Sequence, residues 1–188
     1  MKSIFILFLM LISVMSLSQD QDHIILNSGD TTVCKIKSIG PKKLFTVDEN
    51  GDTQKYKAQD LKGCSYKGKK YIVGKVRGSM CLLKVVIEDD MSLVVHIKPV
   101  NTRSTNEVTN TKTITRQYIK TYLVFLDGTP NDSYTKLGWL WRNKLSKLGS
   151  DCSGFKSKVK KVKWGAWDNP NGEITELVNY YNEKCGDS

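Results

Sequence analysis

Two hydrophobic periodicities divide this chain, and the change between them falls near Pro130. Between His23 and about Leu126, apolar residues alternate with polar ones in short runs, which is typical of half-buried strands. Clusters of turn-forming residues separate these runs at 27–30, 39–43, 48–52 and 66–70. The pattern predicts an antiparallel sheet of about six to eight strands, curled into a sandwich or a partly open barrel.

The clearest pair of strands is CLLKVVI (81–87) followed, after Glu-Asp-Asp, by MSLVVHI (91–97). Alternate apolar residues in each segment predict an antiparallel hairpin with one buried face and one wetter face. The next stretch, 101–113, is rich in Thr and Asn and has no apolar period, so we interpret it as a long exposed loop. The alternative is that its β-prone threonines extend the flanking strands.

In the C-terminal part, apolar residues recur at helical spacing. Leu137, Trp141 and Leu148 predict an amphipathic helix over about 133–148, and the residues from Ile174 to Tyr181 predict another over about 173–184. A third, short helix beginning with Phe155 would bury an apolar seam made of Phe155, Val159, Val162 and Ala166. The predicted fold class is therefore α+β, with an antiparallel sheet followed by about three helices.

Residues 1–18 have the pattern of a secretory signal peptide. Lys2 precedes an apolar run over 4–15, and small residues at Ser16 and Ser18 predict cleavage before Gln19. The run is shorter than the roughly 20 residues that span a bilayer, and there is no cysteine at the cleavage region for lipid attachment. We therefore expect a periplasmic or secreted protein without a transmembrane segment, divided into a signal (1–18), a β-rich domain (19–128) and a helical region (129–188).

Export predicts disulfide bonds among the five cysteines, because thiols tend to pair in oxidising compartments. Cys152 and Cys185 bracket the last two predicted helices and are the first disulfide candidate. An alternative role for Cys152 as a nucleophile at a helix N-terminus is disfavoured against a structural disulfide. The candidates for a second disulfide are Cys34, Cys64 and Cys81, of which one would remain a buried thiol.

Positive charge is the main functional signal, since 29 basic residues outnumber 19 acidic ones and give a net charge of +10. Such a field favours anionic partners. Residues 156–163 contain no acidic side chain and supply the candidate anion-binding side chains Lys156, Lys158, Lys160, Lys161 and Lys163. The favoured interpretation of this run is nevertheless a helix face exposed to solvent. Three tryptophans are candidates for facing a ligand, namely Trp139, Trp164 and Trp167.

Searches for catalytic chemistry find little. The chain has no GxSxG, P-loop or GxGxxG pattern and no cysteine–histidine spacing that suggests a metal site, so we predict no cofactor, no metal and no catalytic residue. Acidic side chains at 88–90 could serve acid–base chemistry, but three acids between strands are typical of a solvated hairpin turn. His96 lies on the polar side of its predicted strand.

Several short segments resemble those of small exported proteins of Bacteroidota-type bacteria. The likeness includes Gly29-Asp30-Thr31, Cys34-Lys35-Ile36, the step from Tyr66 to Tyr71, the pair Asp151-Cys152 and the helix segment 177–182. The resemblance implies export, a β-rich first part and a helical end, and it implies no catalytic residue.

These observations favour an exported, non-catalytic envelope or extracellular module that binds a protein or another ligand through loops on a β scaffold. One alternative is a basic surface that binds anionic lipid or glycan, which includes peripheral contact with an anionic membrane. The other is a hydrolase whose site is assembled only by folding. Export disfavours nucleic acid as a partner, so an envelope or extracellular protein or glycan is expected.

Overall fold

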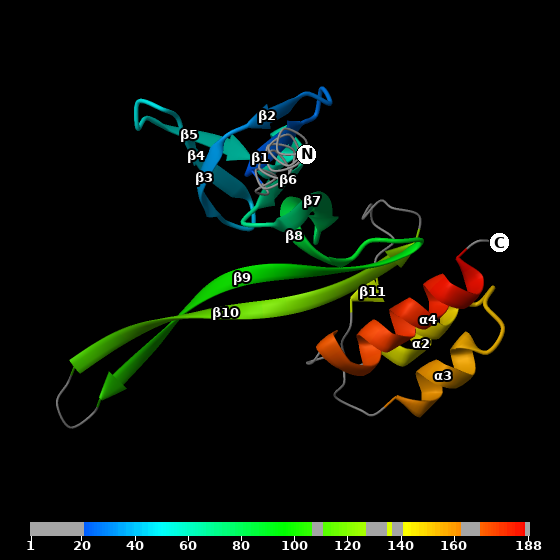
Figure 1. Cartoon of the computed structure of the whole chain (residues 1–188). Helices are drawn as coiled ribbons and strands as arrows, with labels where there is room; N and C mark the ends of the chain where they lie inside the picture. Colours follow the sequence, from blue (N-terminus) through cyan, green and yellow to red (C-terminus); the bar gives the residue numbers. More distant parts are fainter. Residues whose placement is uncertain (1–20, 107–110, 127–134, 137–140, 163–169, 187–188) are drawn as a thin grey trace, which may run out of the picture.

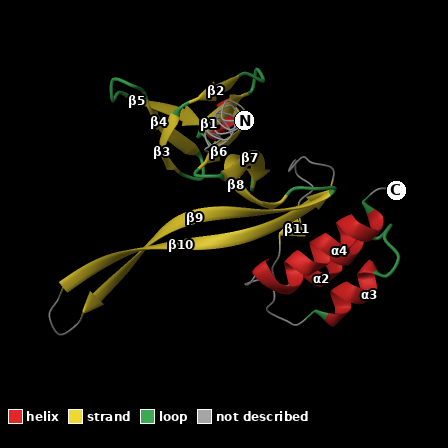
Figure 2. Ribbon diagram, viewed as in Figure 1, coloured by secondary structure: helices red, strands yellow, loops and turns green. Residues whose placement is uncertain are grey.

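The computed structural model describes residues 21–106, 111–126, 135–136, 141–162 and 170–186 of the chain (Figure 1). The predicted signal peptide lies outside this part. The described residues form eleven strands in two antiparallel sheets, followed by helices, which confirms the α+β prediction (Figure 2). Neither sheet closes into a barrel, because each ends in two unpaired edge strands.

The larger sheet has eight strands in the order β11-β10-β9-β8-β7-β6-β1-β2. Its members are β1 (His23–Leu26), β2 (Thr31–Val33), β6 (Leu61–Tyr66), β7 (Lys69–Val76), β8 (Ser79–Ile87), β9 (Met91–Asn106), β10 (Thr111–Leu126) and β11 (Thr135–Lys136). Tight two-residue turns set the register of β6 to β8. Lys67-Gly68 and Arg77-Gly78 have positive φ at both positions, which is the requirement of hairpin turns that follow the twist of the strands.

The smaller sheet contains β3 (Lys35–Ile39), β4 (Lys43–Val47) and β5 (Thr53–Lys57), and a short 3-10 helix, η1 (Ala58–Asp60), leads back to β6. The alternating segment 31–39 is thus divided at Cys34, with its two halves in different sheets. The small sheet packs on the large one around a core of Ile24, Ile36, Leu44, Leu61 and Leu82.

The helical layer consists of α2 (Trp141–Leu148), α3 (Phe155–Lys161) and α4 (Thr175–Cys185), with α4 preceded by the kinked turn η3 (Pro170–Ile174). The predicted helix over 133–148 is described from Trp141 onward, and residues 135–136, which were predicted to be helical, instead pair with β10 as an edge strand. The buried seam of α3 is confirmed for Phe155, Val159 and Val162, whereas Ala166 lies outside the described residues.

Asn182 joins the helical layer to the large sheet. Its side chain accepts a hydrogen bond from the Met91 backbone N–H (2.7 Å) and donates one to the Met91 carbonyl oxygen (3.0 Å). Below it, Phe155 and Tyr181 make an edge-to-face contact with ring centroids 5.4 Å apart, and the Tyr181 hydroxyl donates to the Asp151 carboxylate over 2.8 Å. The bonds to Met91 hold α4 over the start of β9, and the contacts of Tyr181 hold the helical layer together.

Strand pairing places the two layers on the same face of the large sheet. Tyr71, Lys84, Val95 and Tyr122 form one row across β7, β8, β9 and β10, and we call the face that carries them face A. The small sheet covers the part of face A with Leu82 and Tyr71, whereas the helices cover the part with Leu93, Val95 and Tyr122. Face A is therefore covered by two layers that are separate elements of the chain.

The opposite face, face B, carries a third core of Val76, Cys81, Leu83, Val94, Leu123 and Phe125. The hairpin of β8 and β9 is confirmed, but the prediction of one wetter face is wrong, because Leu93 on face A and Val94 on face B are both fully buried. A register shift between Val85 and Ile87 moves Ile87 into the core on face A. The alternate positions of the two segments thus point to different cores.

The interpretation of 101–113 as a loop is also wrong, since β9 and β10 stay paired from Met91↔Leu126 to Asn106↔Thr111. We call the outer part of this pair, residues 97–106 and 111–120, the ribbon. In Figure 1 it extends away from the small sheet and from the helices, and its side chains from 112 to 120 are exposed. The threonines favour strand, and strand pairing satisfies the backbone without an apolar face to bury.

Candidate functional site

A cleft opens on face A at the boundary between the small sheet and the inner end of the ribbon. Its volume is about 690 Å³, within the range of ligand sites. The lining side chains of interest are cationic or aromatic: Lys37, Lys42, Lys43, Lys84, Arg116, Phe45, Tyr66, Tyr71 and Tyr118. They come from β3, β4, β6, β7, β8 and β10, and from the turn between β3 and β4.

The turn between β3 and β4 forms the wall of the cleft and is fixed by hydrogen bonds. The Leu82 backbone N–H donates to the Pro41 carbonyl oxygen (2.8 Å), and the Ala58 N–H donates to that of Lys42 (2.9 Å). The Lys42 ammonium group donates to the Ser79 hydroxyl over 3.1 Å. Because its backbone is bonded to the large sheet and to η1, this lysine-rich turn is preorganised.

The floor of the cleft is the row of face A that begins with Tyr71, Lys84 and Val95. Burial, and secondarily the neighbouring Cys64 and Tyr66, raise the pKa of the Tyr71 phenol. Tyr71 therefore stays neutral around pH 7 and keeps a hydroxyl proton that it can donate to a ligand. The Lys84 side chain is half-buried in this row.

Two cation–aromatic pairs flank the floor. The Lys43 Nζ lies 5.2 Å from the centroid of the Phe45 ring, and the Arg116 guanidinium carbon lies 5.6 Å from that of Tyr118. Such pairs hold the cations near flat apolar surfaces. A ligand in the cleft would therefore meet positive charge and ring faces together.

The charge of the cleft has one sign. Five lining side chains are cationic, and among the described residues that line the cleft there is no carboxylate or histidine. A concave site lined by one sign of charge concentrates its field and attracts counter-ions. The arrangement is suited to holding an anion with an apolar or ring-shaped part, and it provides no carboxylate or imidazole for acid–base work.

The predicted lysine run has different surroundings. Lys156, Lys158, Lys160 and Lys161 are exposed on α3, and Lys163 lies outside the described residues. A hollow of about 260 Å³ beside the run is lined by Lys158 and Lys161 but also by Glu173 and Glu176. The fold thus brings acids to a segment whose sequence has none, and the Lys158 ammonium group lies over the Tyr180 ring (4.0 Å).

The predicted ligand-facing tryptophans, Trp139, Trp164 and Trp167, lie outside the described residues. The aromatic side chains that the described structure brings to the cleft are tyrosines and a phenylalanine instead. They were missed because each looks like an ordinary strand residue in its own segment. The one local signal was the lysine-rich turn at 39–43.

The five cysteines divide into one disulfide and three free thiols. Cys152 and Cys185, the first disulfide candidate, are joined with their Cα atoms 5.5 Å apart. This bond ties the start of α3 to the end of α4.

The second disulfide does not form, since Cys34, Cys64 and Cys81 are all free. Cys81 belongs to the core on face B and the other two to a core on face A. Cys34 follows β2 and Cys64 lies on β6, with β1 between these strands. Neighbouring strands are about 4.8 Å apart, so two spacings add up to about 10 Å. This exceeds the roughly 7 Å between Cα atoms that a disulfide can bridge.

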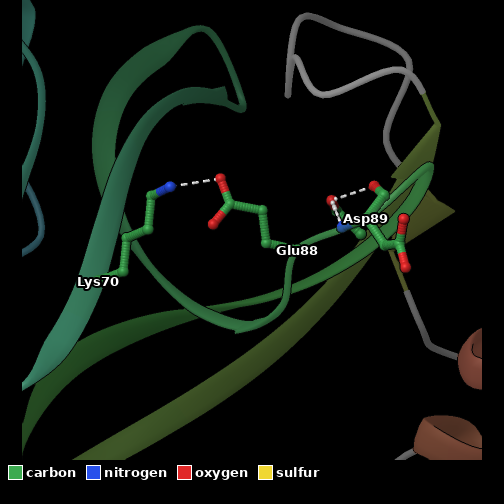
Figure 3. Close-up of polar contacts among 4 residues, drawn as sticks. Lys70, Glu88 and Asp89 are labelled. Atoms are coloured by element: carbon green, nitrogen blue, oxygen red, sulfur yellow. Dashed lines mark hydrogen bonds and ion pairs between the residues drawn. The ribbon is translucent and has the colours of Figure 1, made fainter.

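The acidic turn between β8 and β9 is occupied by structural contacts (Figure 3). Glu88 forms an ion pair with Lys70 on β7 (2.5 Å). The Asp89 backbone N–H donates to the Ser92 hydroxyl, which donates back to the Asp89 carbonyl oxygen (2.9 Å). These contacts close a hairpin turn, and within the described part of the chain no group of three His, Cys, Asp or Glu side chains could hold a metal.

Comparison with protein-family models, with curated proteins and with solved structures found no match. In the described ranges, no helix combines the length and apolar character needed to cross a bilayer. Fold and site together define an α+β protein with a cationic, aromatic-lined cleft.

Proposed function

We propose that this chain is an exported, non-catalytic binding module whose cleft takes an anionic ligand. The observation that carries the proposal is the single sign of charge in the cleft, with five cations and four aromatic rings on a preorganised wall and floor. Cations supply attraction, and ring faces supply contact area for an apolar or sugar-ring surface. A ligand that has both features would use all of the cleft.

Export is supported by the signal-like pattern of residues 1–18 and by the disulfide between Cys152 and Cys185. Disulfides persist in oxidising compartments and are rare in the cytosol. Acidic glycans are among the common polyanions of envelopes and extracellular matrices, so an acidic glycan is the first ligand class to test.

The cleft is a better candidate than the lysine run on α3. Two exposed lysines of α3, Lys158 and Lys161, share a hollow with Glu173 and Glu176, whereas the cations of the cleft converge without acids among the described lining residues. Convergent charges act on one ligand together, but dispersed ones each act weakly through water.

Titration calorimetry with a short acidic oligosaccharide, a tetragalacturonate, tests the proposal. Replacing three cleft lysines by glutamine (Lys37→Gln, Lys43→Gln and Lys84→Gln) should weaken binding about tenfold or more, because three charge contacts are lost. Binding should also weaken as salt rises.

The matched control removes the same charge from α3 by Lys156→Gln, Lys160→Gln and Lys161→Gln. It should leave the affinity within about twofold of the parent, since these side chains lie outside the cleft lining. Far-UV circular dichroism establishes that both triple variants are folded. Equal loss in the two variants, or no binding by the parent chain, would refute the cleft as the site.

A further inference from the structure

The ribbon carries four of its five described cations on one face. Strand pairing and alternation put Lys112, Arg116 and Lys120 of β10 on face A, together with Arg103, which is opposite Ile114. Among the described residues of the ribbon, Lys98 is the only cation on face B. The other side chains of that face are mainly Thr, Ser and Gln. A ribbon charged merely for solubility would not need this asymmetry, because both of its faces meet water.

The charged face of the ribbon is continuous with the cleft. Arg116 and Tyr118 line the cleft and belong to face A of the ribbon as well. Beyond them, Lys112 lies four residues from Arg116, which is about 14 Å along a strand. Cations therefore continue past the mouth of the cleft, with the exposed side chains of Ile114 (62 %) and Tyr118 (60 %) between them.

We infer that the ligand is a linear acidic polysaccharide, which begins in the cleft and continues along face A of the ribbon. This inference rests on the proposed function of the cleft. Beyond the cleft, the ribbon adds a track of about 14 Å from Arg116 to Lys112, so a short ligand fills the cleft alone and a long one also contacts the ribbon. Each further cation adds a weak contact, and several on one chain act together.

The shape of the ribbon favours a flexible chain over a membrane surface. In Figure 1 its two strands cross over one another along their length, so face A turns as it proceeds from the cleft to the tip. A planar bilayer can touch such a face over only part of its length and cannot enter the cleft. A polymer can wind along it and use both.

A polysaccharide is favoured over the other linear polyanions by two features. The signal-like residues 1–18 direct the chain away from the compartments where nucleic acids are concentrated. The apolar side chains between the cations are spaced as single exposed residues, Ile114 and Tyr118, which suit sugar faces rather than a continuous base stack.

Chain length is the variable that tests the inference. Affinity is measured for a galacturonate tetramer and for a dodecamer, with the parent chain, with the ribbon variant Arg103→Gln and Lys112→Gln, and with the α3 variant Lys156→Gln and Lys160→Gln as an equal-charge control. A longer polymer binds somewhat tighter to any site for statistical reasons, so the comparison is between variants at each length.

The ribbon variant should lose about tenfold in affinity for the dodecamer and less than about twofold for the tetramer, while the α3 variant changes neither. An equal loss for both lengths, or dodecamer binding that the ribbon variant leaves unchanged, would overturn the track while the cleft could still bind the tetramer. The choice of polysaccharide would be overturned if the parent chain bound a single-stranded oligonucleotide of matched charge, or anionic vesicles, more tightly than it binds the dodecamer. Loss of tetramer binding in the cleft variant reports separately on the proposed function.

Discussion

The two hydrogen bonds between Asn182 and the backbone of Met91 predict a measurable cost for Asn182→Ala. The bonds are 2.7 and 3.0 Å long, and Met91 is fully buried. Removing the amide loses two bonds of about 1 kcal/mol each and leaves a buried N–H and carbonyl without these partners, so we expect the free energy of unfolding to fall by about 2–4 kcal/mol.

Asn179→Ala is the matched control, because Asn179 is exposed on the same helix. Both substitutions gain the same helix propensity, about 0.5 kcal/mol, so their difference isolates the contact with Met91. Urea unfolding followed by circular dichroism, with the disulfide intact, gives both free energies. Values for the two variants that agree within about 0.5 kcal/mol would show that this contact does not hold the helices to the sheet.

Three further predictions concern the covalent and packed parts of the fold. Replacing Cys152 and Cys185 by serine should lower the free energy of unfolding by about 3–4 kcal/mol in urea titration, because their bond closes a loop with a sequence separation of 33; an unchanged midpoint would contradict this. Gly63→Ala should prevent stable folding, since its Cβ would lie 2.4 Å from the Tyr71 carbonyl oxygen, and a cooperative melt at the parent temperature would refute it. Burial raises the pKa of Cys64 to about 12, so the protonated thiol contributes fully to stability below about pH 9. This contribution is lost between about pH 9 and 12, because the unfolded chain releases the thiol proton before the folded chain does. Cys64→Ala should therefore lose less stability over this range in unfolding experiments at a series of pH values, and an identical pH slope in the two proteins would contradict the prediction.

Local patterns predicted the parts of the structure that local forces determine. The buried positions of α3 follow from an apolar spacing within one helix, and Phe155 and Val159 are fully buried as that spacing requires. Cys152 and Cys185 could be named as a disulfide candidate because they bracket the last helices. The antiparallel architecture followed from short alternating runs between turn-forming residues.

Pairings between distant segments could not be predicted in this way. The alternation of 81–87 and 91–97 fitted one buried face, but the sheet is covered on both sides, and the shift between Val85 and Ile87 changes the face of a residue. The cleft has the same origin, since its cations extend from Lys37 to Arg116 in sequence and meet only through strand order. A run such as 156–163 is visible in the sequence, whereas a convergent cluster is not.

The position of Lys84 links the architecture of face A to the role of the cleft. Its neighbours in the row, Tyr71 and Val95, pack against the core under the small sheet and the core under the helices, respectively. Leucine or valine in place of Lys84 would put an apolar side chain between these two cores, whereas the half-buried lysine lines the cleft, where its long side chain can keep the ammonium group in water. The separation of the two layers over a lysine agrees with the proposed function, in which the ligand brings an anionic group to Lys84.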